Sequence, residues 1–160
     1  MLKSMRIREY RPEDFDRLYR IDRICFEAGI SYSRTELMFY LHCRGSATRI
    51  AEVSGEIGGF AIGRVDQRRA HVITLDVVPE ARRCGVGTTL MNSLHDEFVR
   101  CKADFAVLEV SADNAVARRF YERLHYRYAG VLPGYYGGRV DAFRMVCRLK
   151  RELDDAVSRT

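Results

Sequence analysis

No stretch of this 160-residue sequence approaches the ~20 consecutive apolar residues that a membrane-spanning helix needs. The N-terminus, MLKSMRIREYRPEDFD, also lacks the apolar block of a secretory signal peptide. Membrane insertion and export are therefore not expected, and the sequence predicts a cytoplasmic protein with no membrane partner.

Cysteine occurs in no pattern that would define a disulfide framework or a zinc site. The five cysteines are odd in number and include no CxxC pair, whereas both kinds of site need regular spacing. His42 and Cys43 are adjacent, so their side chains point to opposite sides, and no cluster of further ligands accompanies them. We therefore expect reduced thiols and no metal ion. The other histidines are expected to be structural: His71, His95 and His125.

Charge and length set broad limits on the class of protein. The formal net charge is +5, and the arginines are scattered along the chain rather than gathered in a tail. This excess suits an anionic ligand or a nucleic acid and does not distinguish them. A chain of this length, with 47% apolar residues, buries about 68–70% of its unfolded surface in one core. Because we find no repeat or linker, we predict one domain over residues 1–150 and a polar, frayed tail at 151–160.

Two helices are predicted near the N-terminus. In PEDFDRLYRIDRICF, which starts at Pro12, apolar residues recur at three- and four-residue spacing. The sequence SRTE at 33–36 has the form of a capping box for a second helix. The segment 27–32 between them has no apolar period, and loops of this kind often carry binding residues. It supplies two candidate substrate contacts, Ile30 and Tyr32.

The rest of the chain predicts a mixed α/β fold. From Arg49, the runs IAEV and IGGFAIGRV are typical of an antiparallel hairpin, and a third strand runs from Ala70 to Val78, so three strands precede a helix that begins near Val86. The apolar run FAVLEV follows that helix, and the right-handed crossover rule makes the two flanking strands parallel. Another helix follows Asn114, and YRYAGVL and VDAFRMVCRL form a C-terminal hairpin around PGYYGGR.

The turn RRCGVGT at 82–88 carries the strongest chemical signal. It lies between a strand and an amphipathic helix, where backbone N–H groups and the helix dipole favour an anion. Glycine lets a backbone approach a phosphate closely or adopt positive φ. Because the turn lacks both GK[ST] and GxGxxG, it predicts a pyrophosphate cradle for a cofactor other than a nucleoside triphosphate or a dinucleotide.

The turn and its neighbours resemble the GNAT superfamily of acetyl-CoA-dependent N-acetyltransferases. Arg82, Gly85 and Gly87 match the signature [RQ]-x-x-G-x-[GA], LDVVPEARRCGVGTTLMNSL is similar to the whole strand–turn–helix, LEVSADNAVARRFYERLHY to the next strand and helix, and IREYRPEDFDRL to the family's opening. The resemblance spans about residues 6–149 and is greatest to the ribosomal-protein-alanine (RimI-like) enzymes. It implies a GNAT-like mixed β-sheet with a central strand–helix–strand unit that binds acetyl-CoA, flanked by helices and a C-terminal antiparallel hairpin.

The resemblance also implies roles for individual residues. Glu109 matches the general base, and Tyr121 matches the residue that protonates the departing thiolate. A carboxylate suffices as base because an α-amine has a pKa near ~7.7–8.0, and a tyrosine with a pKa near ~10 is a neutral acid beforehand. Tyr135 and Tyr136 match a tyrosine-pair loop that would wall an extended acceptor. The implied acetyl-CoA contacts are Leu75, Asp76 and Val77 along the pantetheine arm, Arg82, Arg83, Cys84, Gly85, Val86, Gly87 and Thr88 at the pyrophosphate, and Asn114.

Each role has a simpler structural alternative. Glu109 could be an edge-facing carboxylate, although an ionisable group in an apolar strand is costly unless it is paired or useful. Asn114 could serve as a helix N-cap while also contacting the cofactor, and Tyr121 shares a helical face with core residues. Cys84 could be oxidation-sensitive in an electropositive turn, but no histidine base is implied beside it, so a cysteine nucleophile is not expected.

The chain departs from RimI-like proteins where the acceptor would bind. Segment 27–33 replaces their Pro-Trp-Ser element, and there is no tryptophan anywhere. After the last helix, Leu124-His125-Tyr126 replaces Leu-Gly-Phe, which loses a glycine without touching a catalytic position. The favoured acceptor is the N-terminal amine of a peptide or protein, with a ribosomal protein as one candidate. The alternatives are a small amine or polyamine, and a non-catalytic CoA- or nucleic-acid-binding module. The presence of Glu109 and Tyr121 argues against the last alternative, so no nucleic-acid partner is expected.

Overall fold

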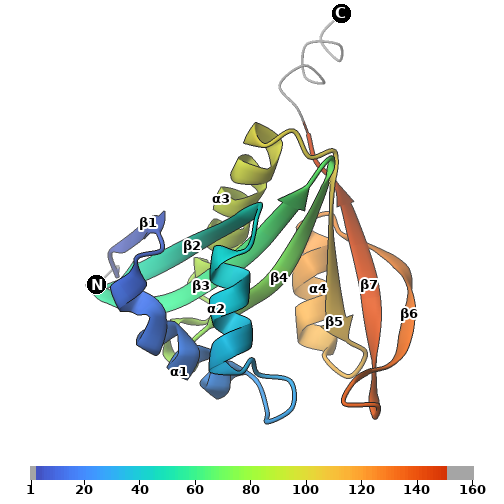
Figure 1. Ribbon diagram of the computed structural model, residues 1–160, viewed down its shortest axis with the longest axis horizontal. Coiled ribbons are helices and arrows are strands. Elements are labelled where there is room, and N and C mark those ends of the chain that lie inside the picture. Colours follow the sequence, from blue (N-terminus) through green and yellow to red (C-terminus); the bar gives the residue numbers. More distant parts are fainter. Residues whose placement is uncertain (1–2, 151–160) are drawn as a thin grey trace, which may run out of the picture.

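The computed structural model describes residues 3–150, in which seven strands form one mixed sheet in the order β1-β2-β3-β4-β5-β7-β6 (Figure 1). The strands are β1 (Met5–Glu9), β2 (Ser46–Val53), β3 (Glu56–Asp66), β4 (Arg69–Val77), β5 (Phe105–Ser111), β6 (Arg127–Tyr136) and β7 (Val140–Arg148). The helices are α1 (Phe15–Cys25), α2 (Arg34–His42), α3 (Val86–Arg100) and α4 (Ala115–Arg123), with 3-10 turns at Pro12–Asp14 and Pro79–Ala81. The predicted α/β class is confirmed.

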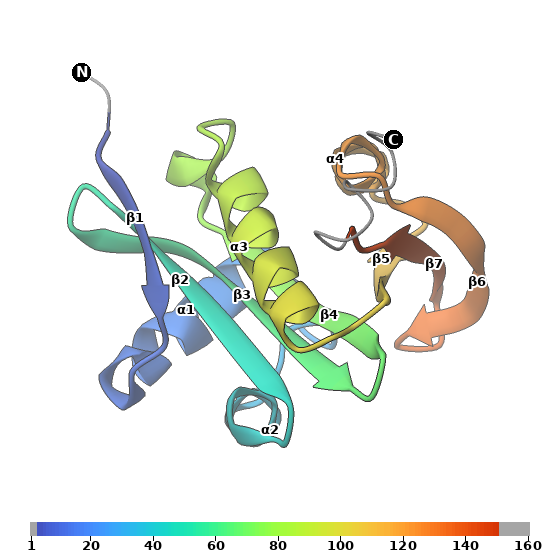
Figure 2. The same ribbon diagram turned by 90° about the horizontal axis from the view of Figure 1, so that it is seen from above.

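Helices cover both faces of the sheet. Helices α1 and α2 lie on one face and α3 and α4 on the other (Figure 2). Helices α1 and α3 turn an apolar stripe inward, as Leu18 of α1 and Leu94 of α3 are fully buried. The predicted capping box of α2 is also present, because Ser33 Oγ accepts from the Glu36 amide at 3.1 Å and Glu36 Oε2 accepts from the Ser33 amide at 2.8 Å.

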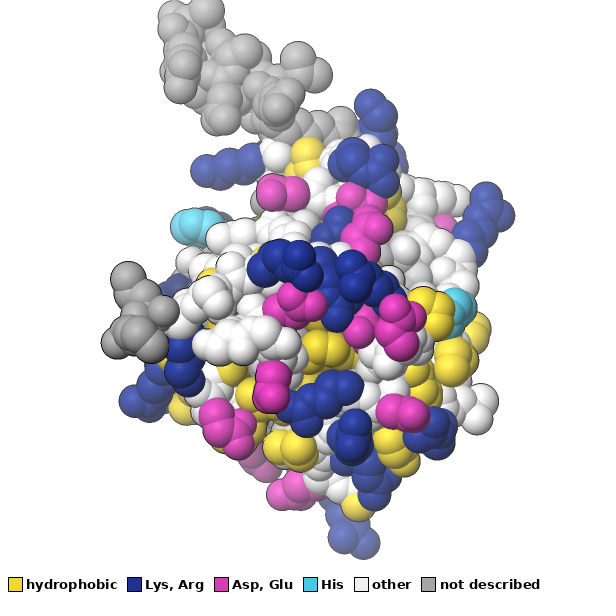
Figure 3. Space-filling model, turned by 90° about the vertical axis from the view of Figure 1, so that its left-hand side faces the viewer, with side chains coloured by type: hydrophobic (Ala, Val, Ile, Leu, Met, Phe, Trp, Pro, Cys, Tyr) yellow, Lys and Arg dark blue, Asp and Glu magenta, His cyan; other side chains and the backbone are white. Residues whose placement is uncertain are grey.

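The N-terminal edge of the sheet corrects the strand count, because four strands and not three precede α3. The additional strand, β1, pairs antiparallel with β2. It alternates arginines with a single half-buried isoleucine, so it lacks the apolar run that marks the other strands. Arg6 pairs with Glu52 at 2.8 Å and Arg8 with Asp14 at 2.8 Å, and basic and acidic side chains are interspersed over this side of the molecule (Figure 3). Charged side chains on an edge strand hinder pairing with other chains.

The sheet opens between β4 and β5. The two strands are parallel, as predicted, but pair only at their first residues, Arg69–His71 with Phe105–Val107. Beyond this point they diverge toward their carboxyl ends, at the lower side of Figure 1. The edge of β4 from Val72 to Val77 therefore has no strand beside it, although β3 pairs with its other edge.

The C-terminal hairpin extends further than predicted. Strand β6 runs through Tyr136, so the expected tyrosine-pair loop is wrong: Tyr135 and Tyr136 end the strand, and the turn spans 137–139. The ladder with β7 shifts register between Leu132 and Tyr136, and Gly134 adopts φ +62° there. A bulge of this kind adds residues without ending the strand, which apolar alternation alone does not reveal.

Several other predictions concern the chain as a whole. No helix within residues 3–150 is long and apolar enough to cross a membrane. All five cysteines fall in the described part of the chain and none forms a disulfide there. The predicted polar tail, 151–160, lies outside the described residues.

Candidate active site

The unpaired edge of β4 forms one wall of the site. Residues Leu75, Asp76 and Val77, predicted to contact the pantetheine arm, lie on this strand where β5 has diverged. The pairing of β3 with β4 skips Ile73, which makes a bulge, and the Tyr32 hydroxyl donates to the Ile73 carbonyl at 3.2 Å. Since a free strand edge offers unpaired N–H and C=O groups, an extended amide chain can hydrogen-bond there as a further strand would.

The start of α3 forms an anion cradle. Gly85, the N-cap, adopts φ +78°, and the first helical bond joins the Thr89 amide to the Gly85 carbonyl. Within residues 3–150, the N–H groups from Arg83 to Thr88 have no acceptor. Unpaired amides at the positive end of a helix dipole are suited to a phosphate. The predicted residues 83–88 therefore form one continuous surface of donors.

Gly87 and Arg82 support this cradle in ways the sequence did not indicate. A Cβ on Gly87 would lie 3.3 Å from the Phe120 ring of α4, so this glycine allows the two helices to approach each other. Arg82 Nε donates to the Val77 carbonyl at 2.9 Å, which ties the turn to the end of β4. Cys84 is exposed and donates to the Arg82 carbonyl at 3.5 Å.

Glu109 is the centre of a charged group on β5. Its carboxylate contacts His71 Nε2 at 2.6 Å and an Arg144 guanidinium nitrogen at 3.3 Å, while only 8% of its side chain is exposed. Burial raises the pKa of Glu109, but the hydrogen bonds and charges of His71 and Arg144 outweigh burial and hold that pKa below its ordinary value. The carboxylate is therefore ionised at neutral pH.

His71 and Arg144 are partners of Glu109 that the sequence analysis missed. His71 was expected to be only structural, and Arg144 was not singled out. Arg144 stands directly opposite Glu109 in the antiparallel β5–β7 register, and opposed charges in that position attract. The register between strands 35 residues apart was the missing signal, because nothing local in the sequence reveals it.

Tyr121 lies on α4 beside the opening. Its ring packs edge-on against Phe120 and Tyr126, with centroids 5.2 and 5.8 Å apart. Burial, together with the nearby Asp76 carboxyl group and Tyr136, raises the pKa of the Tyr121 hydroxyl. This hydroxyl has no hydrogen-bond partner in the part of the chain that the structure describes. Tyr121 thus combines the core-packing role weighed above with a free hydroxyl.

A cluster of tyrosine rings lies near Glu109. Tyr32 contacts Tyr40 at 5.2 Å and Tyr135 contacts Tyr136 at 4.9 Å, measured between ring centroids. Tyr135 lies within electrostatic range of Glu109, Tyr40 and Arg144, and Tyr136 within range of Glu109. Burial raises the pKa of both Tyr135 and Tyr136, that of Tyr136 to about 12. The structure therefore brings three of the four predicted acceptor residues to one place.

Ile30 and Asn114, two further predicted contacts, each take part in a local hydrogen bond. Ile30 is half-buried in a turn that its own amide closes on the Glu27 carbonyl at 3.0 Å. Asn114 caps α4, because its Oδ1 accepts from the Ala117 amide at 3.0 Å, as the structural alternative predicted. The exposed Asn114 side chain keeps its amide donors available.

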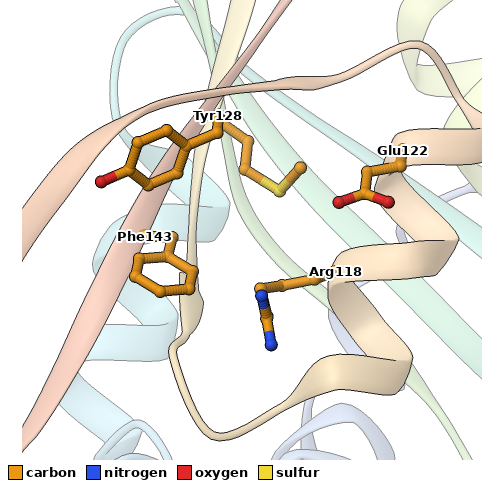
Figure 4. Close-up of a pocket in the computed structure, with 5 residues that line it drawn as sticks. Arg118, Glu122, Tyr128 and Phe143 are labelled. Carbon is orange, nitrogen blue, oxygen red and sulfur yellow. The ribbon is translucent and has the colours of Figure 1, made fainter.

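Two further histidines and one cavity involve none of the predicted site residues. His42 bonds the Met38 carbonyl at 2.9 Å and His95 bonds the Tyr126 hydroxyl at 2.6 Å, and residues 3–150 hold no group of three or more His, Cys, Asp or Glu side chains placed for a metal. A cavity of about 270 Å³ lies between α4 and the β6–β7 hairpin (Figure 4). None of the predicted site residues lines it: its lining is Arg118, Glu122, Tyr128, Phe143 and Met145.

Known acetyltransferase sequences are similar to this chain over most of its length. The acetyltransferase (GNAT) family model matches residues 15–126. An uncharacterized N-acetyltransferase of Methanocaldococcus jannaschii is 32% identical over 143 residues, which are 89% of this chain and 90% of that protein. An N-alpha-acetyltransferase of Sulfurisphaera tokodaii is 28% identical over 162 residues, covering 92% of this chain and 95% of its own.

Solved structures share the same arrangement of strands and helices. The ribosomal-protein-S18-alanine N-acetyltransferase from Escherichia coli is 25% identical with a TM-score of 0.83, over 92% of this chain and 96% of that one. Ard1 from Thermoplasma volcanium is 26% identical with a TM-score of 0.84, over 92% and 99% of the two chains. The similarity therefore covers the cradle, the opening and the residues around Glu109 together.

Proposed function

This chain belongs to the acetyltransferase (GNAT) family, and we propose that it transfers the acetyl group of acetyl-CoA to the N-terminal α-amine of a protein or peptide. The observation that carries the proposal is the convergence, at the opening between β4 and β5, of an ionised carboxylate, a neutral tyrosine hydroxyl and an aromatic wall. The relatives named N-alpha-acetyltransferase and ribosomal-protein-alanine N-acetyltransferase support the choice of acceptor.

The residues present fit acetyl-CoA. The unpaired amides from Arg83 to Thr88 are suited to its pyrophosphate, and the free edge of β4 at 75–77 is suited to the amide groups of its pantetheine arm. The exposed Asn114 amide lies at the N-cap of α4. When bound, acetyl-CoA supplies a thioester carbonyl that an amine can attack and a thiolate that can leave.

Glu109 is the proposed general base. Because its pKa lies below the ordinary value, it stays ionised and does not efficiently deprotonate an ammonium group, whose pKa is near ~7.7–8.0 at a chain N-terminus. The enzyme instead uses the fraction of acceptor already present as free amine, and Glu109 accepts the proton released as the C–N bond forms, directly or through one water. The carboxylate oxygen can only accept, so His71 Nε2 must carry the proton in their hydrogen bond.

Tyr121 is the proposed general acid. Its raised pKa keeps the hydroxyl protonated until the sulfur departs, and its hydroxyl is free of other partners in the described residues. Donation of that proton to the leaving sulfur is the complementary half of acid–base catalysis. The proposed acid thus lies on α4 and serves the leaving thiolate, and the proposed base lies on β5 and serves the attacking amine.

The acceptor chemistry favours an α-amine over a lysine. Near pH 8 an α-amine is substantially unprotonated, whereas a lysine with a pKa near ~10.4 has less than about one per cent free base. Tyr32, Tyr135 and Tyr136 supply aromatic area and hydroxyl groups for the first residues of an extended chain. We propose the cytoplasm as the site of action and a ribosomal protein as the first acceptor to test, since a similar structure carries that substrate in its name.

A turnover assay tests the proposal. Purified protein is given acetyl-CoA and a panel of peptides with free N-termini, N-terminally blocked lysine peptides, and polyamines, and release of CoA is measured. We expect turnover with the free N-termini. Turnover confined to polyamines or other small amines would replace the proposed acceptor class, and no turnover with any amine would refute an acetyltransferase role.

A further inference from the structure

Two carboxyl groups are buried together between α1 and β4. Asp22 of α1 and Asp76 of β4 are both 0% exposed. Asp22 Oδ2 accepts from the Tyr32 amide at 2.6 Å, and Asp76 Oδ1 accepts from the Thr74 hydroxyl at 2.5 Å. Isolated ionised carboxylates are not buried without strong compensation, so the other two oxygens need an explanation.

The remaining oxygens, Asp22 Oδ1 and Asp76 Oδ2, are buried and have no N–H or hydroxyl donor in the described part of the chain. The two carboxyl groups lie within interaction range of each other, and each one shifts the pKa of the other. Because an ionised carboxylate only accepts, one proton held between the two groups would supply the donor that both remaining oxygens lack. Burial raises the pKa of both Asp22 and Asp76, and for Asp76 the charge of Asp22 adds to the effect.

The pair joins two parts of the active site. Through the Tyr32 amide, Asp22 holds the end of the α1–α2 loop. The Tyr32 ring, with Tyr135 and Tyr136, forms the proposed aromatic wall for the acceptor, called the acceptor wall below. Asp76 is the second-to-last residue of β4, the strand proposed to bind the pantetheine arm, and lies within electrostatic range of Tyr121. The Tyr32 hydroxyl makes a second link to β4 at the Ile73 bulge. Loss of the shared proton would place a second negative charge between the α1–α2 loop and β4.

We propose that Asp22 and Asp76 share one proton and act as a positioning pair, which fixes Tyr32 of the acceptor wall against the cofactor-binding strand. The proposal rests on the proposed function in one respect, namely that the α1–α2 loop contacts the acceptor. The pair acts through Tyr32 and not on the substrate itself, since both carboxyl groups are fully buried. The ionisable groups that face it from α1, the loop, α2, the turn before α3 and α4 are Arg23, Cys25, Tyr32, Glu36, Arg82 and Tyr121.

The proton gives the pair a defined pH dependence. A carboxyl group whose pKa is raised on folding binds its proton more tightly in the folded state, so its contribution is complete at low pH and is lost as pH rises through the folded-state pKa. Ionisation of both groups would repel Asp22 from Asp76 and release the Tyr32 amide. The acceptor KM of the native enzyme should therefore rise toward alkaline pH, with a smaller change in the acetyl-CoA KM.

Asp22→Asn is the decisive variant. The asparagine oxygen can still accept from the Tyr32 amide and its NH₂ group can donate to Asp76, so the hydrogen bonds persist without a shared proton. We expect an acceptor KM within about two-fold of the native value at pH 7 and no alkaline rise. Asp22→Ala should raise the acceptor KM about ten-fold, because it leaves the Tyr32 amide and Asp76 without their partner, and should change the acetyl-CoA KM much less. Asp16→Asn on the exposed face of the same helix is the matched control.

A second readout is independent of the acceptor. Infrared difference spectra at neutral pH should show the C=O stretch of a protonated carboxylic acid in the native protein, and this band should disappear in Asp22→Asn and persist in Asp16→Asn. If peptides are not acetylated but the infrared band behaves as expected, the proposed acceptor is overturned and the shared proton is supported. An unchanged band in Asp22→Asn, or an acceptor KM with the same alkaline rise as the native enzyme, would overturn the positioning pair.

Discussion

Glu109 lies on β5 and Asp76 on β4, the two strands that border the opening, while Asp22 packs against Asp76 from α1. Of these three carboxyl groups, only Glu109 forms ion pairs within the described residues. Cationic or hydrogen-bonding partners lower the pKa of Glu109, whereas burial raises that of Asp22 and Asp76. The same functional group is therefore ionised on one strand and shares a proton on the other. When the surroundings of two carboxyl groups move their pKa values apart, one can act as a base while the other has a structural role.

Replacement of the base should have the largest effect. Glu109→Gln keeps the shape and removes the acceptor of the amine proton, so we expect kcat/KM to fall by about 10²–10⁴-fold, with partial recovery at high pH where free amine accumulates. Initial rates between about pH 6 and pH 9 measure this, and Glu56→Gln at the exposed start of β3 is the control. A native rate for Glu109→Gln at every pH would show that the proton goes elsewhere.

Reversal of charge in the cradle should weaken acetyl-CoA binding. Arg83 is exposed and its amide belongs to the unpaired donors, so Arg83→Glu places a carboxylate beside a bound pyrophosphate. We expect the acetyl-CoA Kd to rise about ten-fold or more by calorimetry, with a steep dependence on salt because the charges are exposed. Arg127→Glu, exposed at the start of β6, makes the same charge change and should bind normally. Equal effects of both would indicate net charge rather than a cradle.

Loss of the aromatic wall should act on the acceptor alone. Replacing Tyr135 and Tyr136 together by alanine removes an edge-to-face pair and its contact area, and we expect the peptide KM to rise about ten-fold while the acetyl-CoA KM changes less than two-fold. Tyr128→Ala, a 63% exposed position on the same strand, is the control. Similar increases in both KM values would mean that the tyrosines shape the opening rather than the acceptor site.

The smallest effect concerns the tuning of Glu109. Arg144 contacts Glu109 at 3.3 Å with 39% of its side chain exposed, so solvent screens much of the interaction. Arg144→Met should raise the pKa of Glu109, and because activity requires the ionised carboxylate, the acidic limb of the kcat/KM profile should move to higher pH by less than about one unit. Arg148→Met, exposed at the end of β7, should leave that limb in place. A shift to lower pH would contradict the assigned charge coupling.

Features with local signals were predictable from the sequence. The Ser33 capping box, the glycine-rich turn at 82–88 and the strand lengths around the crossover helix each depend on neighbouring residues. Glu109 and Tyr121 were singled out by their match to the family's motif after that turn, and their catalytic roles stay predictions. Strand β1 was not predicted because its five residues include two arginines and no apolar run.

Features that depend on long-range register were not predictable. His71 meets Glu109 across 38 residues, and Asp22 meets Asp76 across the boundary between a helix and a strand. Asp76 was predicted only as a backbone contact of the cofactor, since nothing in LDVV shows that its side chain faces another carboxyl group. The partners that set the charge of each acid are therefore visible only in the folded chain.

The position of the acetyl group on a two-amine peptide tests the central claim most directly. A peptide with one free N-terminus and one internal lysine is incubated with acetyl-CoA and the native protein, and tandem mass spectrometry locates the added acetyl group. The account predicts modification of the α-amine with the lysine left free, because Glu109 serves an amine that is already partly unprotonated. Acetylation of the lysine with the α-amine left free would contradict it.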